Sequence, residues 1–138
     1  MNRGIVALLA LLMPLCALGG ELWLPEGIYA TAVNGARVSP HQDRLPLTEG
    51  KQVVTLRYAN PYRFHKEHHE VVISKPFYLV FTVDDAGPYR VQAQLPTDLQ
   101  RAKRFARQPE VSLVRSGEPV AFEAYVGDEV INALLSRP

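Results

Sequence analysis

Residues 77–83 of this chain read Phe-Tyr-Leu-Val-Phe-Thr-Val, and the first five of them are apolar without interruption. A short apolar run of this kind, placed between Lys75-Pro76 and the turn residues 84–88, is typical of a strand buried on both faces. We therefore expect residues 77–83 to form a central β-strand that is covered on each side.

Stretches on both sides of this run alternate between apolar and polar residues. Val54, Leu56 and Tyr58 share one face of the run 53–58, and a similar alternation recurs at 89–95. Because successive side chains of a strand point to opposite faces, this period of two predicts half-buried strands with one wet face.

Turn residues separate the predicted strands and set the fold class. Asn34-Gly35 lies between the extended runs 28–33 and 36–38. This dipeptide readily adopts the positive φ angles of a type I′ hairpin turn. Two later runs, 111–115 and 120–126, complete about seven strands in about a hundred residues. We expect a mainly β fold, either a small antiparallel β-sandwich or a partly open barrel.

Two stretches are candidates for exposed strand edges. Pro46 lies between Leu45 and Leu47, and a proline has no N–H to donate to a neighbouring strand. The run from Glu70 to Ser74 follows a polar, histidine-rich loop. We expect either edge to be open for pairing with another chain.

The period changes near residue 97. Thr97 to Gln100 matches a capping box, which predicts that Thr97 starts a helix over about residues 98–108, before Pro109. Its predicted apolar face consists of Leu99, Ala102, Phe105 and Ala106, and its basic residues are Arg101, Lys103, Arg104 and Arg107. A second, short C-terminal helix is expected after Asp128, with Val130, Ile131, Leu134 and Leu135 on one face.

The basic side of the helix at 98–108 has two interpretations. It would suit contact with anionic lipid or with the outside of a polyanion. It is also what the wet side of an ordinary amphipathic helix looks like, and this second interpretation is the one we expect.

The first 20 residues have the order of a secretory signal peptide. Arg3 precedes an apolar stretch from Ile5 to Leu15, and small residues follow as far as Gly20. We expect cleavage near Glu21, export to the periplasm, a single β-rich domain over residues 21–138, and no integral membrane span. Lipid attachment at Cys16 is the alternative, and it is disfavoured because Leu15 is bulky for the residue before a lipid-acceptor cysteine.

The composition after residue 20 excludes several functions. The remaining 118 residues contain 51 apolar residues and 14 basic against 14 acidic residues, so their net charge is zero. This balance argues against a nucleic-acid-binding protein that works by bulk charge and against an acidic disordered tail. These residues contain no cysteine, so the expected exported chain cannot form a disulfide.

A histidine cluster is a candidate metal site. His65, His68 and His69 fall within five residues, beside Glu67 and Glu70. Imidazole and carboxylate groups at short spacing bind Cu²⁺, Ni²⁺ or Zn²⁺, and His41 is a possible further ligand. The alternative is a solvated hairpin loop that is kept polar to protect the neighbouring strand edges.

Residues around the same loop are candidates for binding a partner. Tyr58, Tyr62 and Phe64 would form an aromatic contact patch, and Val71 and Ile73 lie on the second candidate edge. The alternative for the aromatic residues is that they cover one end of the sandwich core.

The sequence lacks the common catalytic motifs. It contains no Gly-x-Ser-x-Gly elbow, no glycine-rich phosphate loop and no His-Glu-x-x-His, and no cysteine nucleophile remains after residue 20. We expect a protein that is not an enzyme and that needs no cofactor.

The order of these motifs resembles a known family. The runs 32–38, 45–58, 71–77 and 101–109 resemble those of small exported proteobacterial proteins of unknown function. One enterobacterial member of that family is described as a curli synthesis inhibitor, and it carries a long C-terminal extension where this chain stops at Pro138. The resemblance implies a periplasmic protein that restrains amyloid assembly, and it implies no catalytic residue.

We therefore expect a non-enzymatic periplasmic protein that binds another exported protein or an envelope component. Capping of a growing amyloid strand by an exposed sheet edge is the physical route we expect. The alternative function is a periplasmic transition-metal-binding protein that uses His65, His68 and His69.

Overall fold

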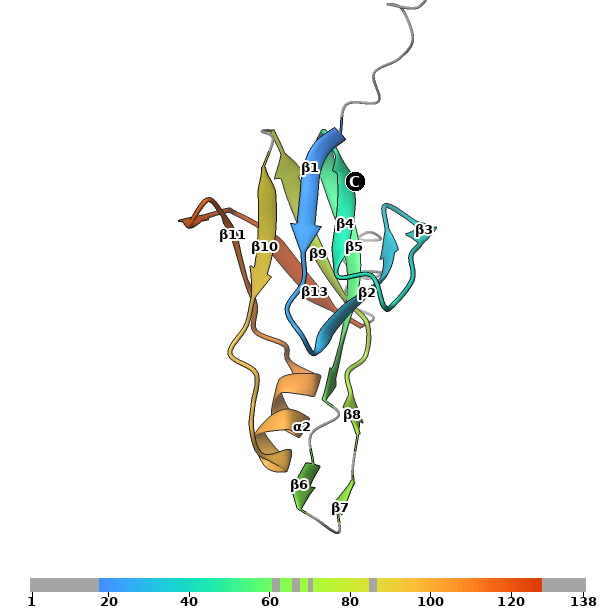
Figure 1. Ribbon diagram of the computed structural model, residues 1–138, viewed down its shortest axis with the longest axis vertical. Helices are drawn as coiled ribbons and strands as arrows, with labels where there is room; N and C mark the ends of the chain where they lie inside the picture. Colours follow the sequence, from blue (N-terminus) through green and yellow to red (C-terminus); the bar gives the residue numbers. More distant parts are fainter. Residues whose placement is uncertain (1–17, 61–62, 66–67, 70, 85–86, 128–138) are drawn as a thin grey trace, which may run out of the picture.

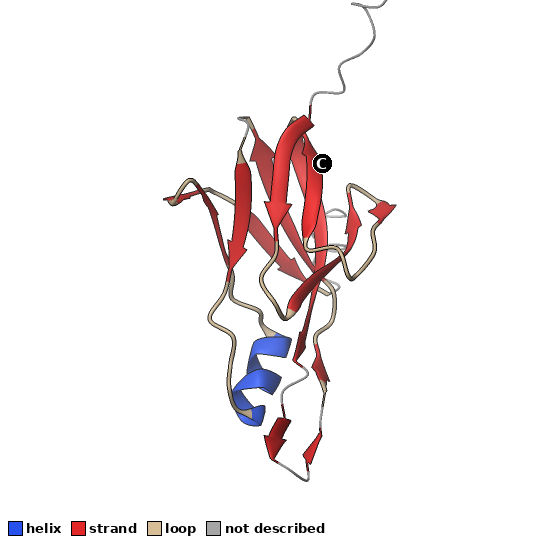
Figure 2. Cartoon of the chain, viewed as in Figure 1, coloured by secondary structure: helices blue, strands red, loops and turns tan. Residues whose placement is uncertain are grey.

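The computed structural model describes residues 18–60, 63–65, 68–69, 71–84 and 87–127. These residues form two packed β-sheets, with one α-helix at the end of the sandwich (Figures 1 and 2). The mainly β, two-sheet architecture predicted from the alternating runs is confirmed.

The first sheet has five strands. Their order is β12 (Glu118–Pro119), β11 (Ser112–Arg115), β10 (Pro88–Gln92), β1 (Leu18–Trp23) and β4 (Arg44–Thr48). β1 runs parallel to β10 and antiparallel to β4. β4 is therefore a terminal strand, as the proline in it predicted.

The second sheet has six strands. Their order is β13 (Glu123–Val126), β9 (Phe77–Val83), β5 (Gly50–Asn60), β2 (Ile28–Val33) and β3 (Ala36–Arg37), and β8 (Val72–Ile73) pairs with the far end of β5. A separate antiparallel pair, β6 (Arg63–His65) and β7 (His68–His69), extends beyond that end (Figure 1).

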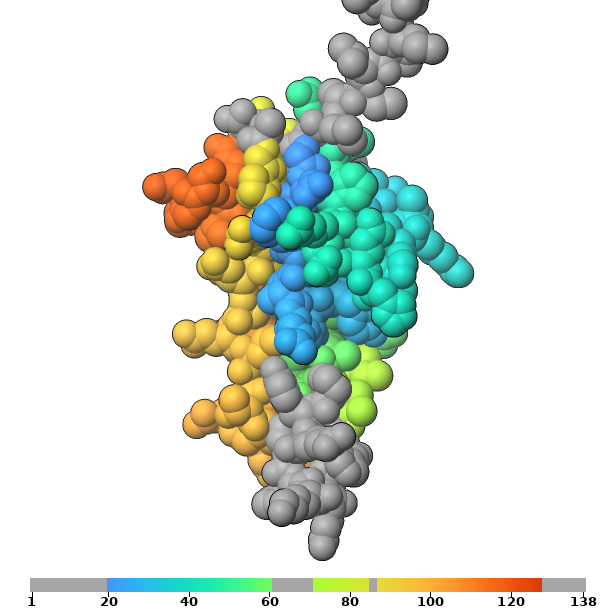
Figure 3. Space-filling model, viewed as in Figure 1, coloured from blue at the N-terminus to red at the C-terminus, as the bar shows by residue number. Residues whose placement is uncertain are grey.

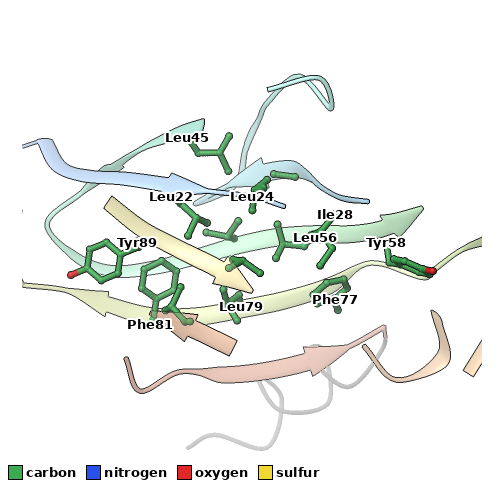
Figure 4. Packing of buried hydrophobic residues seen from close by; sticks show 14 of the residues in the cluster. Leu22, Leu24, Ile28, Leu45, Leu56, Tyr58, Phe77, Leu79, Phe81 and Tyr89 are labelled. Atoms are coloured by element: carbon green, nitrogen blue, oxygen red, sulfur yellow. The ribbon is translucent and has the colours of Figure 1, made fainter. Parts of the chain in front are cut away.

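The core lies between the inner faces of the two sheets. On β5, every second residue from Gln52 to Asn60 is buried, as the period of two predicted. Figure 4 shows Leu22 and Leu45 of the first sheet on one side of the core and Phe77 and Leu79 of the second sheet on the other.

The run 77–83 is an interior strand, but the prediction that both its faces are covered is only partly right. Phe77, Leu79 and Phe81 are buried in the core, whereas Tyr78 and Val80 on the opposite face are half-buried. A sheet in a two-layer sandwich packs on one side only, so an apolar outer face need not be fully covered.

The hairpin at Asn34-Gly35 is confirmed. Asn34 and Gly35 have φ angles of 51° and 83°, the left-handed values of a type I′ turn. The Asn34 side chain also fixes the turn to β5, because its Oδ1 accepts a hydrogen bond from the Val53 N–H at 2.8 Å.

The predicted helix at 98–108 is observed as α2 (Leu99–Arg107), but its cap differs from the prediction. Asp98, and not Thr97, is the N-cap residue, and its Oδ1 accepts a hydrogen bond from the Arg101 N–H at 2.8 Å. The second predicted helix, after Asp128, lies outside the described residues. Among the residues that are described, no helix is long and apolar enough to cross a membrane.

Candidate functional site

β8 is a short strand that pairs on one side only within the described residues. Its residues pair antiparallel with the end of β5, with Ile73 opposite Ala59 and Val72 opposite Asn60. In the described part of the chain no strand pairs with the other side of β8. α2 packs against β8 as well as against the end of β5.

The hydrogen-bond pattern determines which main-chain groups face the free edge. The Ser74 N–H donates to the Tyr58 carbonyl at 2.8 Å, so Ser74 faces β5. Main-chain groups along an antiparallel strand alternate between the two sides. The N–H and C=O of Ile73 therefore point away from β5, toward the free edge.

The side chains of this segment alternate in the same way. Val72 is 8% exposed and packs inward, whereas Val71 and Ile73 are 59% and 53% exposed. These two are the large hydrophobic residues that the described chain leaves exposed. An exposed apolar pair beside unpaired main-chain groups is a typical binding feature of sheet edges.

Ser74 holds β8 against β5. Its Oγ accepts a hydrogen bond from the Tyr58 N–H at 2.8 Å and donates one to the Lys75 carbonyl at 2.8 Å. The Arg57 Nε donates to the Ser74 carbonyl at 3.1 Å. These hydrogen bonds attach the end of β8 to β5, so the strand that carries the edge is part of the sheet.

The sequence analysis identified neither Ser74 nor Arg57. A signal for Ser74 was present, because the alternation that buries Val72 also directs Ser74 inward. A hydroxyl group at an inward position needs a hydrogen-bond partner, which it finds in the main chain of β5 and of its own segment.

Tyr58 does not belong to the contact patch that was predicted for it. Its side chain is fully buried, and its ring lies 4.7 Å from the Phe105 ring of α2 in an edge-to-face arrangement. Its hydroxyl accepts a hydrogen bond from the Asn60 Nδ2 at 2.6 Å. The alternative proposed for the aromatic residues, that they cover the end of the core, is correct for Tyr58.

The other aromatic and histidine candidates cannot be placed by their side chains. Tyr62 lies outside the described residues, and only the backbone of Phe64 is described, in β6. The backbone of β6 and β7 pairs His65 with His68 and Arg63 with His69, while their side chains lie outside the description. His41 lies in the loop before β4, and the described residues contain no group of three ligating side chains.

The second predicted edge, at β4, is partly blocked. The Leu24 N–H donates to the Asp43 carbonyl at 2.8 Å, and the pairing continues through Leu22 opposite Leu45. Main-chain groups alternate between the two sides of a strand, so Asp43 and Leu45 face β1, whereas Arg44 and Pro46 face the open side of β4. Since proline has no N–H, β4 offers an incoming strand one donor fewer than a strand without proline would.

A separate cavity of about 690 Å³ lies between β9 and the connection from β12 to β13. Within it, Arg115 is 3.3 Å from the Asp84 carboxylate and donates to the Tyr89 hydroxyl at 3.4 Å. Arg115 and Tyr89 belong to the first sheet and Asp84 follows β9 of the second, so these contacts connect the ends of the two sheets.

Comparison with known proteins gives a family and no further relative. A family model described as an uncharacterized protein conserved in bacteria (DUF2057) matches residues 21–129. No curated protein and no solved structure matches the chain.

Proposed function

The chain belongs to this bacterial family, DUF2057, and we propose that it binds an extended segment of another exported protein along the free edge of β8. The observation that carries the proposal is the combination at Ile73 of outward main-chain groups with an exposed apolar side chain. An extended segment would add to β8 as a further strand, on the side away from β5.

The two parts of the edge would contribute differently. Main-chain hydrogen bonds from Ile73 would give affinity that is independent of the partner's sequence. Val71 and Ile73 would select apolar side chains, because burying each of them stabilises a complex by about 1.5–3 kcal/mol.

The base of the edge supports tight binding. Ser74, Tyr58 and Asn60 are buried and hydrogen bonded, so the edge is already in the conformation that a partner strand needs. A preorganised edge loses little conformational entropy when it binds.

An amyloid subunit is the class of partner that we propose. An amyloid fibre grows when a further subunit adds its strand to the end of the fibre. If β8 paired with the strand at that end, it would block the next addition. The resemblance to the family with a curli synthesis inhibitor supports the same class. Export to the periplasm, which the N-terminal 20 residues predict, would bring the two proteins together and is part of the proposal.

Fibre growth in the presence of the purified protein tests this proposal. We expect equimolar protein to lengthen the lag and slow the growth of a curli-type subunit. The variant Val71→Ser/Ile73→Ser should need at least about tenfold more protein for the same delay, since it loses both apolar contacts.

The matched control is Val114→Ser, a half-buried valine of β11 on the other sheet, which should act like the unmodified protein. Unchanged fibre growth with the unmodified protein contradicts the proposal. An equal loss of effect in the control and in the β8 variant contradicts the assignment to β8.

A second candidate function is transition-metal binding by the hairpin of β6 and β7. The observation that favours it is the backbone register that places His65 opposite His68. Residues opposite each other on antiparallel strands are close enough for two imidazoles to share one ion.

Calorimetric titration with Cu²⁺ and Zn²⁺ tests the metal site. We expect one saturable binding step, and replacement of His65, His68 and His69 by Ala should abolish it. His41→Ala tests whether this histidine, the possible further ligand, contributes to the same binding step. Heat that persists in the triple variant contradicts a site at these residues.

A further inference from the structure

Trp23 stands between two arginines on the outer face of the first sheet. It is opposite Arg44 of β4 on one side and opposite Arg90 of β10 on the other. The guanidinium carbon of each arginine lies 4.2 Å from the centre of the Trp23 ring. The indole therefore fixes the position of both cations by cation–π contact.

The two guanidinium groups keep their hydrogen-bond donors available. Both arginines are exposed, and neither guanidinium forms an ion pair or hydrogen bond with another described residue. The nearest acidic group of this face, Glu21, instead accepts a hydrogen bond from the Trp23 Nε1 at 2.9 Å. The arginines thus present two positioned cations without a bound counter-charge.

α2 extends the same layer of the molecule. It packs through Phe105 on the side of β5 that carries Tyr58, which is the side covered by the first sheet elsewhere. Figure 3 shows α2, in orange, below β10 and β1 on one face of the molecule.

α2 carries further exposed cations in this layer of the molecule. Its exposed basic residues are Arg101, Lys103, Arg104 and Arg107. Arg101, Arg104 and Arg107 line a shallow hollow of about 540 Å³ together with Phe105 and a single carboxylate, Glu110. Although Arg101 also contacts Asp98 at 3.4 Å, the hollow remains predominantly basic.

We propose that this basic face, formed by Arg44, Trp23 and Arg90 on the sheet and by the arginines of α2, docks on an anionic lipid surface. Its ligands would be the phosphates of the lipid headgroups. The cations come from two separate elements of one broad face, which suits an extended charged surface better than one small anion. Arginine and tryptophan are also residues that lie well at a membrane–water interface.

This proposal concerns a different surface from the free edge of β8. Val71 and Ile73 lie on the side of β8 opposite Val72, and Val72 faces the same interior as Tyr58. A protein that docks through the basic face would therefore keep the Val71 and Ile73 side chains turned away from the lipid.

Vesicle sedimentation tests the basic face directly. We expect the protein to sediment with vesicles of phosphatidylglycerol and phosphatidylethanolamine, and not with phosphatidylcholine alone. Binding should weaken as salt is raised, because exposed charges are screened. Near a charged bilayer each arginine contributes about 1 kcal/mol, so Arg44→Gln/Arg90→Gln should bind roughly 30-fold more weakly.

A matched control separates position from total charge. Arg37→Gln/Lys51→Gln removes two exposed cations from β3 and from the outer face of the second sheet, and it should bind like the unmodified protein. Trp23 is the only tryptophan, so its emission should change when anionic vesicles are added.

Three results would overturn the proposal. These are no sedimentation with anionic vesicles, an equal loss in the control and in the Arg44/Arg90 variant, and a Trp23 emission response to inorganic pyrophosphate without one to vesicles. Since fibre growth is measured without lipid, failure here leaves the proposed function of β8 unaffected.

Discussion

Gln52 shows how a buried polar residue specifies one turn of this fold. It is fully buried, and its Nε2 donates to the Thr48 carbonyl at 2.9 Å and to the Gly50 carbonyl at 3.1 Å. Its Oε1 accepts a hydrogen bond from the Asn34 Nδ2 at 2.8 Å. One side chain therefore connects the turn before β5 with the turn after β2.

Replacing Gln52 by Ala should destabilise the protein. The substitution leaves the Asn34 amide and the Thr48 and Gly50 carbonyls without this partner, and one such loss costs about 1–3 kcal/mol. Urea unfolding measures the difference. The exposed Gln94→Ala should change the free energy of unfolding by less than about 0.5 kcal/mol, and equal effects of both variants would contradict the role of Gln52.

Single residues also show where sequence reasoning reached its limit. The type I′ turn at Asn34-Gly35 was predictable because it depends on local backbone preference. Tyr58 was not, because an aromatic residue at a strand end suits either a surface or a core, and packing against Phe105 decides between them. The stacking of Trp23 between two arginines depends on strands that are distant in the sequence.

The N-cap of α2 can be tested by substituting the two residues that precede the helix. Asp98→Ala should lower stability by about 1 kcal/mol, because it removes the acceptor for the Arg101 N–H. Thr97→Ala should have little effect, since Thr97 is not the N-cap. Thermal unfolding of both variants measures the comparison, and a larger loss in the Thr97 variant would restore the cap predicted from the sequence.

β1 is the longest strand that the sequence analysis missed. Its first three residues, 18–20, lie at the end of the predicted signal peptide, and its alternation is too short to stand out from that apolar segment. By contrast, β2 was predicted from the turn dipeptide that follows it, β5 from its alternation and β9 from its uninterrupted apolar run. β1 is therefore recognised as a strand only from its pairing with β4 and β10.

The place of β1 predicts where processing must stop. Glu21 to Trp23 pair with both β4 and β10, and Leu22 is fully buried. Loss of a buried leucine costs about 2–5 kcal/mol, so the exported protein should keep Leu22. N-terminal sequencing of that protein should give Gly20 or Glu21 as the first residue. A first residue after Leu22, or an uncleaved chain, would contradict this prediction.

At the scale of the whole molecule, the zero net charge of residues 21–138 hides an uneven distribution. Exposed cations gather on the face formed by the first sheet and α2, and exposed apolar residues lie on the far side of β8. The proposals above give each surface one role: lipid docking for the basic face and strand capture for the edge. The basic face requires the tertiary structure, because its residues are distant in the sequence, whereas the edge at β8 is a continuous run that the sequence indicated.

The central claim is that a partner strand pairs with the main chain of Ile73, and amide hydrogen exchange of this residue tests it most directly. In the free protein the Ile73 N–H should exchange fast, because it faces the open edge of β8, while the Ser74 N–H, bonded to Tyr58, should be protected. Adding a curli-type subunit at a concentration that slows fibre growth should slow exchange at Ile73 by at least about tenfold and leave Ser74 protected. An unchanged exchange rate at Ile73 under those conditions would contradict the account.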